Sequence, residues 1–174
     1  MGQTLLLTGR PGVGKTTIIK KAAEALADEA GGFYTEEIRN EDGRRTGFRL
    51  VTLGGEEAVM AHVDLRSRGL PRVSRYGVDV ETIANVGATA LREAVASDRV
   101  VIVDEIGKME LFCDAFKDAV KRAVESDSPV LGTVMSGRHP WVNDLKTSKD
   151  VDVWEVTVGN RDQLPSRILD WLSR

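Results

Sequence analysis

Residues 9–16 read Gly9-Arg10-Pro11-Gly12-Val13-Gly14-Lys15-Thr16, which matches without a gap the glycine-rich pattern of a phosphate loop. The apolar run Thr4-Leu5-Leu6-Leu7 precedes the octapeptide and is typical of a buried strand, and a helical pattern begins near Lys15. Glycines let successive backbone N–H groups approach phosphate oxygens, and the positive end of the helix dipole faces the same point. The sequence therefore predicts a strand, a phosphate-binding loop and a helix in direct succession.

Two side chains of this octapeptide carry specific chemistry. Lys15 is expected to reach the β- and γ-phosphates of a nucleotide and to act as a catalytic cation. The Thr16 hydroxyl is expected to ligate Mg²⁺, the cofactor that this loop implies. The alternative is a glycine-rich turn between a strand and a helix, in which the lysine has no role.

A second run of apolar residues, Val100-Val101-Ile102-Val103, leads directly into Asp104-Glu105. A buried parallel strand that ends in an acidic pair delivers both carboxylates to the carboxyl edge of the sheet, where open α/β folds bind ligands. Asp104 is placed to hold Mg²⁺, through water or directly. Glu105 is placed to orient or deprotonate the attacking water. The alternative is that both carboxylates only cap the turn at Ile106-Gly107.

The rest of the chain alternates between strand and helix patterns, which predicts a mostly parallel α/β sheet flanked by helices. Asp42-Gly43 is a strong turn signal, and an antiparallel β-meander is expected over about 33–63. We expect a single domain over residues 1–174. The remaining expectations are a first helix that continues to Ala30 and stops at Gly31-Gly32, a loop over 66–78, helices over 80–96, 111–124 and 164–172, and strands over 130–135 and 151–158.

Composition excludes several classes of protein. Of the 174 residues, 41% are hydrophobic and 29% are charged, which rules out a disordered chain. The formal net charge is −3, from 24 basic and 27 acidic residues, so a dedicated nucleic-acid binder is not indicated. No apolar run reaches the roughly 20 residues of a membrane span, no signal peptide is visible, and Cys113 is the single cysteine. We expect a cytoplasmic monomer without a membrane partner.

Three further stretches accompany the phosphate loop: Gly32-Phe33-Tyr34-Thr35-Glu36-Glu37-Ile38-Arg39, Arg75-Tyr76-Gly77-Val78-Asp79 and Val103-Asp104-Glu105-Ile106-Gly107-Lys108-Met109-Glu110. Together the four resemble the nucleoside-triphosphatase family first characterised from thermophiles, which has a human cancer-related member. The resemblance implies a RecA-like P-loop fold and Mg²⁺-dependent release of the γ-phosphate from purine and pyrimidine nucleotides. It also implies nucleotide contacts at Gly9, Arg10, Pro11, Gly12, Val13, Gly14, Lys15 and Thr16, and around Val100, Val101, Ile102, Val103, Asp104, Glu105, Ile106 and Gly107.

Several weaker signals leave alternatives open. Arg138 follows the strand over 130–135 and is a candidate for stabilising charge on the leaving phosphate, or else a surface arginine. Glu36 and Arg39 could approach the phosphates or belong to a solvated hairpin. Arg75 and Tyr76 could cover the nucleotide or form a packed turn. Trp141 could stack on a base, although a tryptophan is more often a core or interface residue.

Three functions are compatible with the sequence. The leading one is hydrolysis of nucleoside triphosphates to diphosphate and phosphate, with poor base selectivity. A P-loop kinase that transfers the γ-phosphate to a small or nucleic-acid hydroxyl is the first alternative. A nucleotide-dependent regulatory module is the second, but no Asn-Lys-x-Asp guanine-reading motif occurs, because Asn143-Asp144-Leu145-Lys146 does not fit it.

Overall fold

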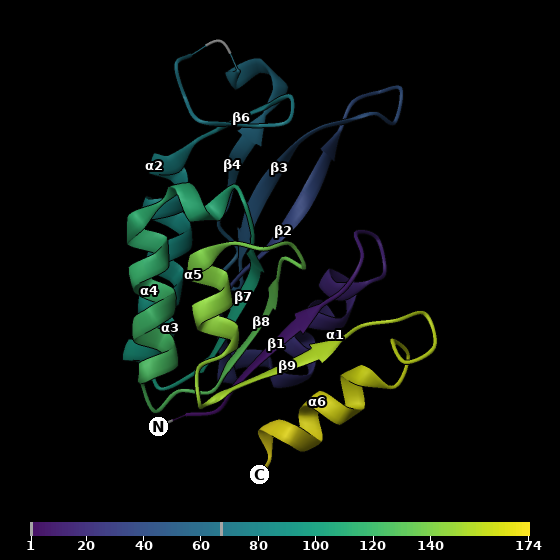
Figure 1. Cartoon of the computed structure of the whole chain (residues 1–174), viewed down its shortest axis with the longest axis vertical. Coiled ribbons are helices and arrows are strands. Elements are labelled where there is room, and N and C mark those ends of the chain that lie inside the picture. Colours follow the sequence, from purple (N-terminus) through teal and green to yellow (C-terminus); the bar gives the residue numbers. More distant parts are fainter. Residues whose placement is uncertain (1, 67) are drawn as a thin grey trace.

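In the computed structural model, which describes residues 2–66 and 68–174, nine strands form one mixed sheet (Figure 1). The order is β5-β6-β4-β3-β2-β7-β8-β1-β9. The strands are β1 Thr4–Thr8, β2 Ala30–Arg39, β3 Arg45–Thr52, β4 Glu57–His62, β5 Arg72–Val73, β6 Tyr76–Val78, β7 Val100–Ile106, β8 Val130–Val134 and β9 Val151–Glu155. The pairs between neighbours from β2 to β9 are parallel, and those from β2 to β5 are antiparallel. The predicted α/β fold with an antiparallel meander is confirmed; that the chain forms a single domain stays a prediction.

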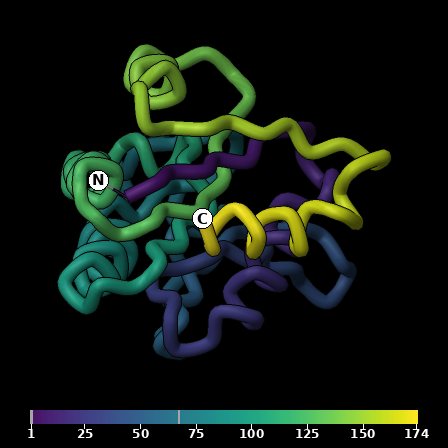
Figure 2. The backbone as a smooth tube through the Cα atoms, turned by 90° about the horizontal axis from the view of Figure 1, so that it is seen from below, coloured from purple at the N-terminus to yellow at the C-terminus, as the bar shows by residue number. Residues whose placement is uncertain are grey.

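Helices cover both faces of the sheet. They are α1 Lys15–Leu26, α2 Val80–Thr82, α3 Thr89–Ala96, α4 Asp114–Glu125, α5 Pro140–Lys146 and α6 Leu164–Leu172, with 3₁₀ turns at η1 Ala27–Glu29, η2 Val63–Leu65 and η4 Glu110–Phe112 and a π-helical segment η3 at Ile83–Ala88. Helices α1 and α6 pack on one face around Leu5, Leu7 and Ile102, and α3, α4 and α5 pack on the other around Leu6 and Val103. Figure 2 shows α5 and α6 on opposite sides of β1. The inner parallel strands β1, β7 and β8 are therefore buried on two sides, as their apolar runs predict, whereas the edge strand β9 is partly exposed.

The parallel register brings the key segments to one edge of the sheet. Thr8, the last residue of β1, pairs with Glu155 of β9, and Phe33 of β2 pairs with Val103 of β7. The phosphate loop leaves β1 at this edge and enters α1 at Lys15, in the predicted strand-loop-helix order. The acidic pair Asp104-Glu105 ends β7 at the same edge.

The first helix is shorter than predicted. It ends at Leu26, and Gly31-Gly32 lies inside β2 rather than serving as a helix stop. The reason is close packing, because a Cβ atom at Gly32 would overlap the carbonyl oxygen of Ile102, and one at Gly31 would lie 2.9 Å from Cβ of Ala94. Both glycines allow β2 to approach its neighbours, so this part of the interpretation was wrong.

Other boundaries differ because tertiary contacts override local pattern. The segment predicted as a loop over 66–78 contains the hairpin β5-β6, held by pairing of β6 with β4; its Ser67 lies outside the described residues. The third helix begins at Asp114, since Cys113 is extended. Helix α5 was not predicted, although Pro140 stands at its first turn, a favoured position. The helix predicted over 80–96 is continuous, with the π-helical segment in its middle.

Candidate active site

The phosphate loop connects the end of β1 to the start of α1 through glycines in unusual backbone conformations. Gly12 and Gly14 have φ angles of 78° and 110°, a left-handed conformation that strains other residues. The Lys15 ammonium donates a hydrogen bond of 2.7 Å to the Gly9 carbonyl, so it reaches back across the whole loop. This geometry places a positive charge and the start of α1 at one point, as the octapeptide predicts.

Asp104 is the buried carboxylate of the site. Its side chain is 1% exposed, and its carboxylate accepts hydrogen bonds from the Thr16 hydroxyl at 2.8 Å and the Thr133 hydroxyl at 2.5 Å. The backbone N–H of Thr35 approaches the same carboxylate at 3.5 Å. Burial raises the pKa of Asp104, while the hydroxyls of Thr133 and Thr16 act in the opposite direction. Residues from α1, β8 and β2 thus fix one carboxylate beside the phosphate loop.

Glu105 is half-buried next to Asp104, and behind it lies a second glutamate, Glu110. Burial raises the pKa of Glu105, and the neighbouring Asp104 charge adds to the effect. Glu110 is 5% exposed and accepts a hydrogen bond of 3.2 Å from the Gly107 N–H. Burial, with the Glu105 charge second, raises the pKa of Glu110 to about 8. In the sequence, Glu110 belongs to the stretch that ends in Met109-Glu110.

The donor set at this point fits a magnesium ion. Thr16 and Asp104 supply a hydroxyl and a carboxylate, the oxygen ligands that Mg²⁺ prefers. Among the described residues, no group of three or more His, Cys, Asp or Glu side chains could hold a metal ion. A bound Mg²⁺ would therefore complete its shell with phosphate oxygens and water, which is typical of nucleotide sites.

The structure does not bring Arg138 into this arrangement. Arg138 is exposed between β8 and α5 and makes no hydrogen bond or ion pair with another described residue. Trp141 packs against the α3–α4 side of the core, which fits its alternative interpretation. Arg138 as a catalytic residue stays a prediction.

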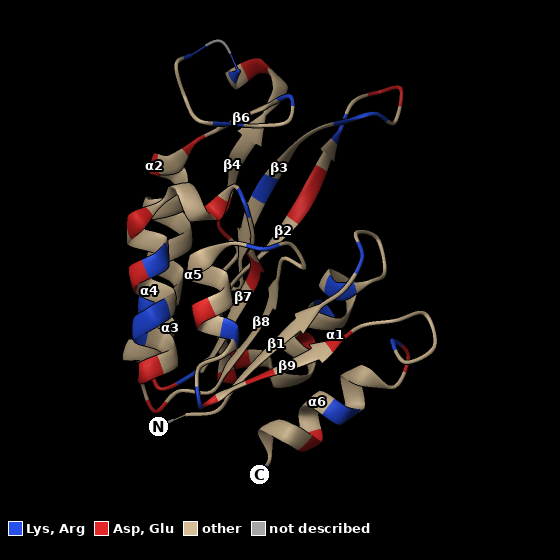
Figure 3. Ribbon diagram, viewed as in Figure 1, with Lys and Arg blue, Asp and Glu red and all other residues tan. Residues whose placement is uncertain are grey.

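Charged side chains of the β2-β3 hairpin pair with one another and with α1. The Glu36 carboxylate contacts Lys20 at 2.9 Å and Arg49 at 2.8 Å, so it bridges β2 to α1 and β3. These two hydrogen bonds lower the pKa of Glu36, the one from Lys20 more strongly. Figure 3 shows the acidic part of β2 beside the basic part of β3. The solvated-hairpin interpretation describes this region better than direct phosphate contact.

The pair Arg75-Tyr76 forms a packed turn. The Tyr76 hydroxyl accepts hydrogen bonds from Arg45 at 3.0 Å and Arg75 at 3.3 Å, and the Tyr76 ring stacks edge-on against Phe48. The guanidinium groups oppose the burial of Tyr76 and leave its pKa below the usual value. Arg39 also has a partner, because it forms an ion pair of 2.5 Å with Glu37.

Sequence reasoning missed one arginine at the phosphate loop. Arg161, between β9 and α6, donates a hydrogen bond of 3.3 Å from Nη1 to the Val13 carbonyl. The two residues are 148 positions apart, and no motif marks Arg161. Only the pairing of β9 with β1 brings them together.

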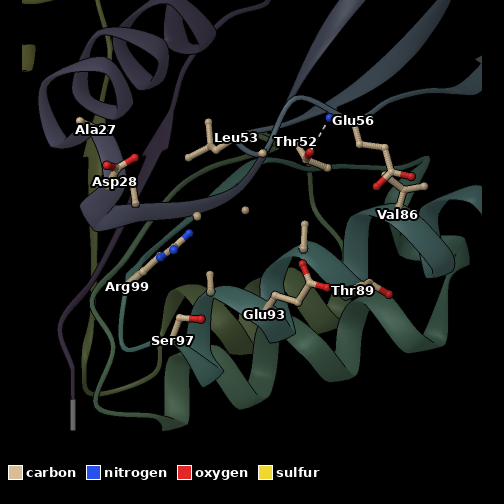
Figure 4. A pocket seen from close by; sticks show the side chains of 16 residues that line it. Ala27, Asp28, Thr52, Leu53, Glu56, Val86, Thr89, Glu93, Ser97 and Arg99 are labelled. Atoms are coloured by element: carbon tan, nitrogen blue, oxygen red, sulfur yellow. Dashed lines mark hydrogen bonds between the residues drawn. The ribbon is translucent and has the colours of Figure 1, made fainter.

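A cavity of about 500 Å³ lies elsewhere, at the opposite edge of the sheet (Figure 4). Its lining includes Asp28, Thr52, Glu93 and Arg99, from η1, β3, α3 and the loop before β7. No residue of the phosphate loop lines this cavity. The loop, the Thr16–Asp104 pair and the half-buried Glu105 identify the candidate site on chemical grounds.

Comparison with known proteins assigns the chain to a family. A model of the family described as NTPase matches residues 4–169. The chain belongs to the NTPase family. Among NTPase relatives, "Nucleoside-triphosphatase THEP1" of Thermotoga sp. (strain RQ2) is 43% identical over 97% of this chain and 94% of its own length. The protein of the same name from Methanopyrus kandleri is 44% identical over 98% and 95%.

Solved structures of NTPase relatives share the fold. The crystal structure of THEP1 from the hyperthermophile Aquifex aeolicus superposes with a TM-score of 0.85 at 35% identity, covering 98% of this chain and 99% of the other. The solution structure of a human cancer-related nucleoside triphosphatase gives 0.81 at 37% identity, covering 99% and 97%. The resemblance seen in the four sequence stretches is thus confirmed. Among residues 2–66 and 68–174, no helix has the length and apolar character needed to cross a membrane.

Proposed function

We propose that this protein hydrolyses nucleoside triphosphates to nucleoside diphosphate and phosphate. One observation carries the proposal: the Thr16 hydroxyl and the buried Asp104 carboxylate meet at 2.8 Å beside the phosphate loop, with Glu105 next to them. The names of the relatives from Thermotoga and Methanopyrus support hydrolysis rather than transfer to an acceptor. The substrate enters with its phosphates in the loop and its γ-phosphate toward Glu105.

Binding rests on the loop and on Lys15. The loop amides and the start of α1 would hold the β-phosphate, and the Lys15 ammonium would exchange the Gly9 carbonyl for β- and γ-oxygens. A cation there neutralises charge that develops as the bond between the γ-phosphorus and the bridging oxygen breaks. We include Gly9 through Thr16 and the end of β7, from Val100 to Gly107, in the nucleotide site.

Thr16 and Asp104 would hold Mg²⁺, as their oxygen donors suit that ion. When bound, the ion supplies charge neutralisation at the β- and γ-oxygens. Thr133 and Thr35 orient the Asp104 carboxylate, so its direction is set by β8 and β2 before any ligand arrives. Such supporting contacts normally hold a metal ligand in place.

Glu105 would act as the general base. The oxygen of the attacking water forms a bond to the γ-phosphorus, the diphosphate leaves with the bridging oxygen, and the water proton passes to the Glu105 carboxylate. The raised pKa of Glu105 makes the carboxylate a stronger proton acceptor near neutral pH. Arg138 would need to move toward the γ-phosphate to stabilise the transition state, and it is free of bonds that would prevent this.

The test is phosphate release by the purified protein. Separate incubations with ATP, GTP, CTP and UTP in the presence of Mg²⁺ should give phosphate and nucleoside diphosphate in a 1:1 ratio without any acceptor, and omission of Mg²⁺ should abolish the release. Similar rates for the four nucleotides would agree with a site that lacks a base-reading motif. Release only after addition of an acceptor, with phosphorylated acceptor as product, would establish a kinase instead.

A further inference from the structure

Arg161 contacts the phosphate loop at Val13 and Gly14. Its Nη1 atom is 3.3 Å from the Val13 carbonyl oxygen, and its Cδ atom lies 3.9 Å from the position a Cβ would take on Gly14. The side chain therefore runs along the Val13–Gly14 peptide. The acceptor is a neutral carbonyl, and Arg161 forms no ion pair with another described residue.

The position of Arg161 is built into the sheet. Strand β9 pairs with β1, and the Val156 N–H extends this pairing with a hydrogen bond of 2.7 Å to the Thr8 carbonyl. The chain next forms a tight turn, in which the Asn160 side chain bonds to the Thr157 N–H and the Glu155 carbonyl, each at 2.8 Å. The Arg161 N–H closes the turn on the Thr157 carbonyl at 3.0 Å.

This arrangement affects the anion through one peptide group. In a trans peptide the C=O and the N–H point in opposite directions, so a partner on the Val13 oxygen lies opposite to the Gly14 N–H. Within the described residues, no hydrogen bond from the Gly14 N–H occurs, which leaves this donor for the interior of the loop. A charged donor on the carbonyl polarises the peptide and makes its N–H a stronger donor.

We propose that Arg161 is a positioning residue of the phosphate loop, acting on the bound phosphates through the Val13–Gly14 peptide rather than by touching the nucleotide. The inference rests on the proposed function, because it concerns the same phosphate site. The contribution of Arg161 to affinity is then the same for any ligand that places phosphates in the loop, with or without a nucleoside.

The test compares Arg161→Met and Arg161→Lys with wild type in calorimetric titrations of ATP and of inorganic tripolyphosphate, in EDTA so that neither is hydrolysed. Arg167→Met is the matched control, because Arg167 lies six residues further along and places its guanidinium over the Trp154 ring at 4.8 Å. We expect Arg161→Met to weaken both ligands about tenfold, the size of a lost charged hydrogen bond, and Arg161→Lys to restore most of this loss. Arg167→Met should leave both affinities unchanged.

Two results would overturn the inference. Weakening of ATP alone would mean that Arg161 touches the nucleoside directly, and unchanged affinity for both ligands would mean that it has no role. A wild-type protein that binds neither ligand would instead refute the proposed function. If Arg161→Met does not fold, Arg161→Gln serves in its place, since it also lacks the charge; we expect Arg161→Gln to show the same loss for both ligands.

Discussion

The two edges of the central sheet hold their charged side chains in different ways. At the edge where β1, β7 and β8 end, Asp104 and Glu110 are 1% and 5% exposed, and both accept hydrogen bonds from neighbouring strands or loops. At the opposite edge, Asp28, Glu93 and Arg99 are exposed around the cavity of about 500 Å³. These three side chains form no ion pair within the described part of the chain.

The comparison shows that buried, oriented charge distinguishes the candidate site from an open cavity lined by exposed charges. Removing a carboxylate from water is costly unless other groups compensate, so a fold retains such groups where they have a use or a fixed set of partners. Exposed charges around an open cavity carry little such cost. Substitutions at the two edges test this difference.

Glu105→Gln should have the largest effect on turnover. The amide keeps the size of the side chain but cannot accept the proton of the attacking water, and general-base assistance is worth about 10² to 10⁴ in rate. We expect a fall in kcat of at least about a hundredfold with nucleotide affinity nearly unchanged. Glu93→Gln, at the opposite edge, is the control and should have wild-type kcat. Equal losses of binding and turnover in Glu105→Gln would make Glu105 a ligand or structural group.

Lys15→Ala should reduce kcat/KM by about two to three powers of ten, because it removes the cation at the transferring phosphoryl group. The variant should fold, since within the described residues the Lys15 ammonium bonds only to the Gly9 carbonyl, and Lys15 is not part of the core. Steady-state kinetics beside Lys21→Ala, an exposed lysine of the same helix, measures the effect. A near wild-type rate in Lys15→Ala would refute the phosphate-loop assignment.

Asp104→Asn should shift the magnesium requirement. An amide is a poorer ligand than a carboxylate for a hard cation, and it cannot accept from Thr16 and Thr133 through two oxygens. We expect the Mg²⁺ concentration for half-maximal rate to rise about 10- to 100-fold, the range seen when supporting groups of metal sites are lost. A magnesium titration that matches wild type would exclude Asp104 from this role.

Glu110→Gln should change the pH dependence of stability. The pKa of Glu110 is raised from 4.5 to about 8, so between these pH values the folded state binds a proton that the unfolded state has lost. The contribution of Glu110 is therefore fully present below about pH 4.5 and is lost as pH rises to about 8. Urea unfolding at pH 5.5, 7 and 8.5 should show Glu110→Gln gaining stability over wild type with rising pH. Glu125→Gln, at an exposed site, should show no such trend.

Substitution at the opposite edge should have the smallest effect. Glu93→Ala combined with Arg99→Ala removes two charges from the cavity without touching the phosphate site. We expect kcat and KM for ATP within about twofold of wild type, because exposed substitutions usually change stability by less than about 0.5 kcal/mol. A tenfold loss of activity in the double variant would show that the two edges are coupled.

Much of the phosphate site was predictable from local sequence. The octapeptide at 9–16 and the acidic pair after the apolar run at 100–103 follow from short-range rules: glycine conformations, strand length and the strand-to-helix order. The roles assigned to Lys15, Asp104 and Glu105 stay predictions until the variants are measured. Glu110 could have been suspected from its place three residues after Gly107, which its carboxylate contacts in the structure.

The remaining features depend on contacts between distant segments. No local signal separates a helix that ends at Leu26 from one that continues to Ala30, because Gly31 and Gly32 are required by the approach of Ala94 and Ile102. The hairpin β5-β6 is held in place by the pairing of β6 with β4. The glycines and the proline of that segment favour a loop, so its local sequence does not indicate a hairpin. Hydrogen bonds between strands are a property of the pair, so one strand's sequence cannot specify them.

The sequence by itself determined the α/β class, the phosphate loop and the acidic strand end, because each depends on residues close together in the chain. Only the tertiary structure decided which groups complete the site: the Thr133 hydroxyl and the Thr35 backbone N–H around Asp104, Glu110 behind Glu105, and Arg161 against Val13. Three of these four come from β2, β8 and the segment after β9, and parallel pairing brings the ends of β7, β8, β1 and β9 to one edge. The physical reason is that strand order and register, set by packing over the whole core, place these residues together.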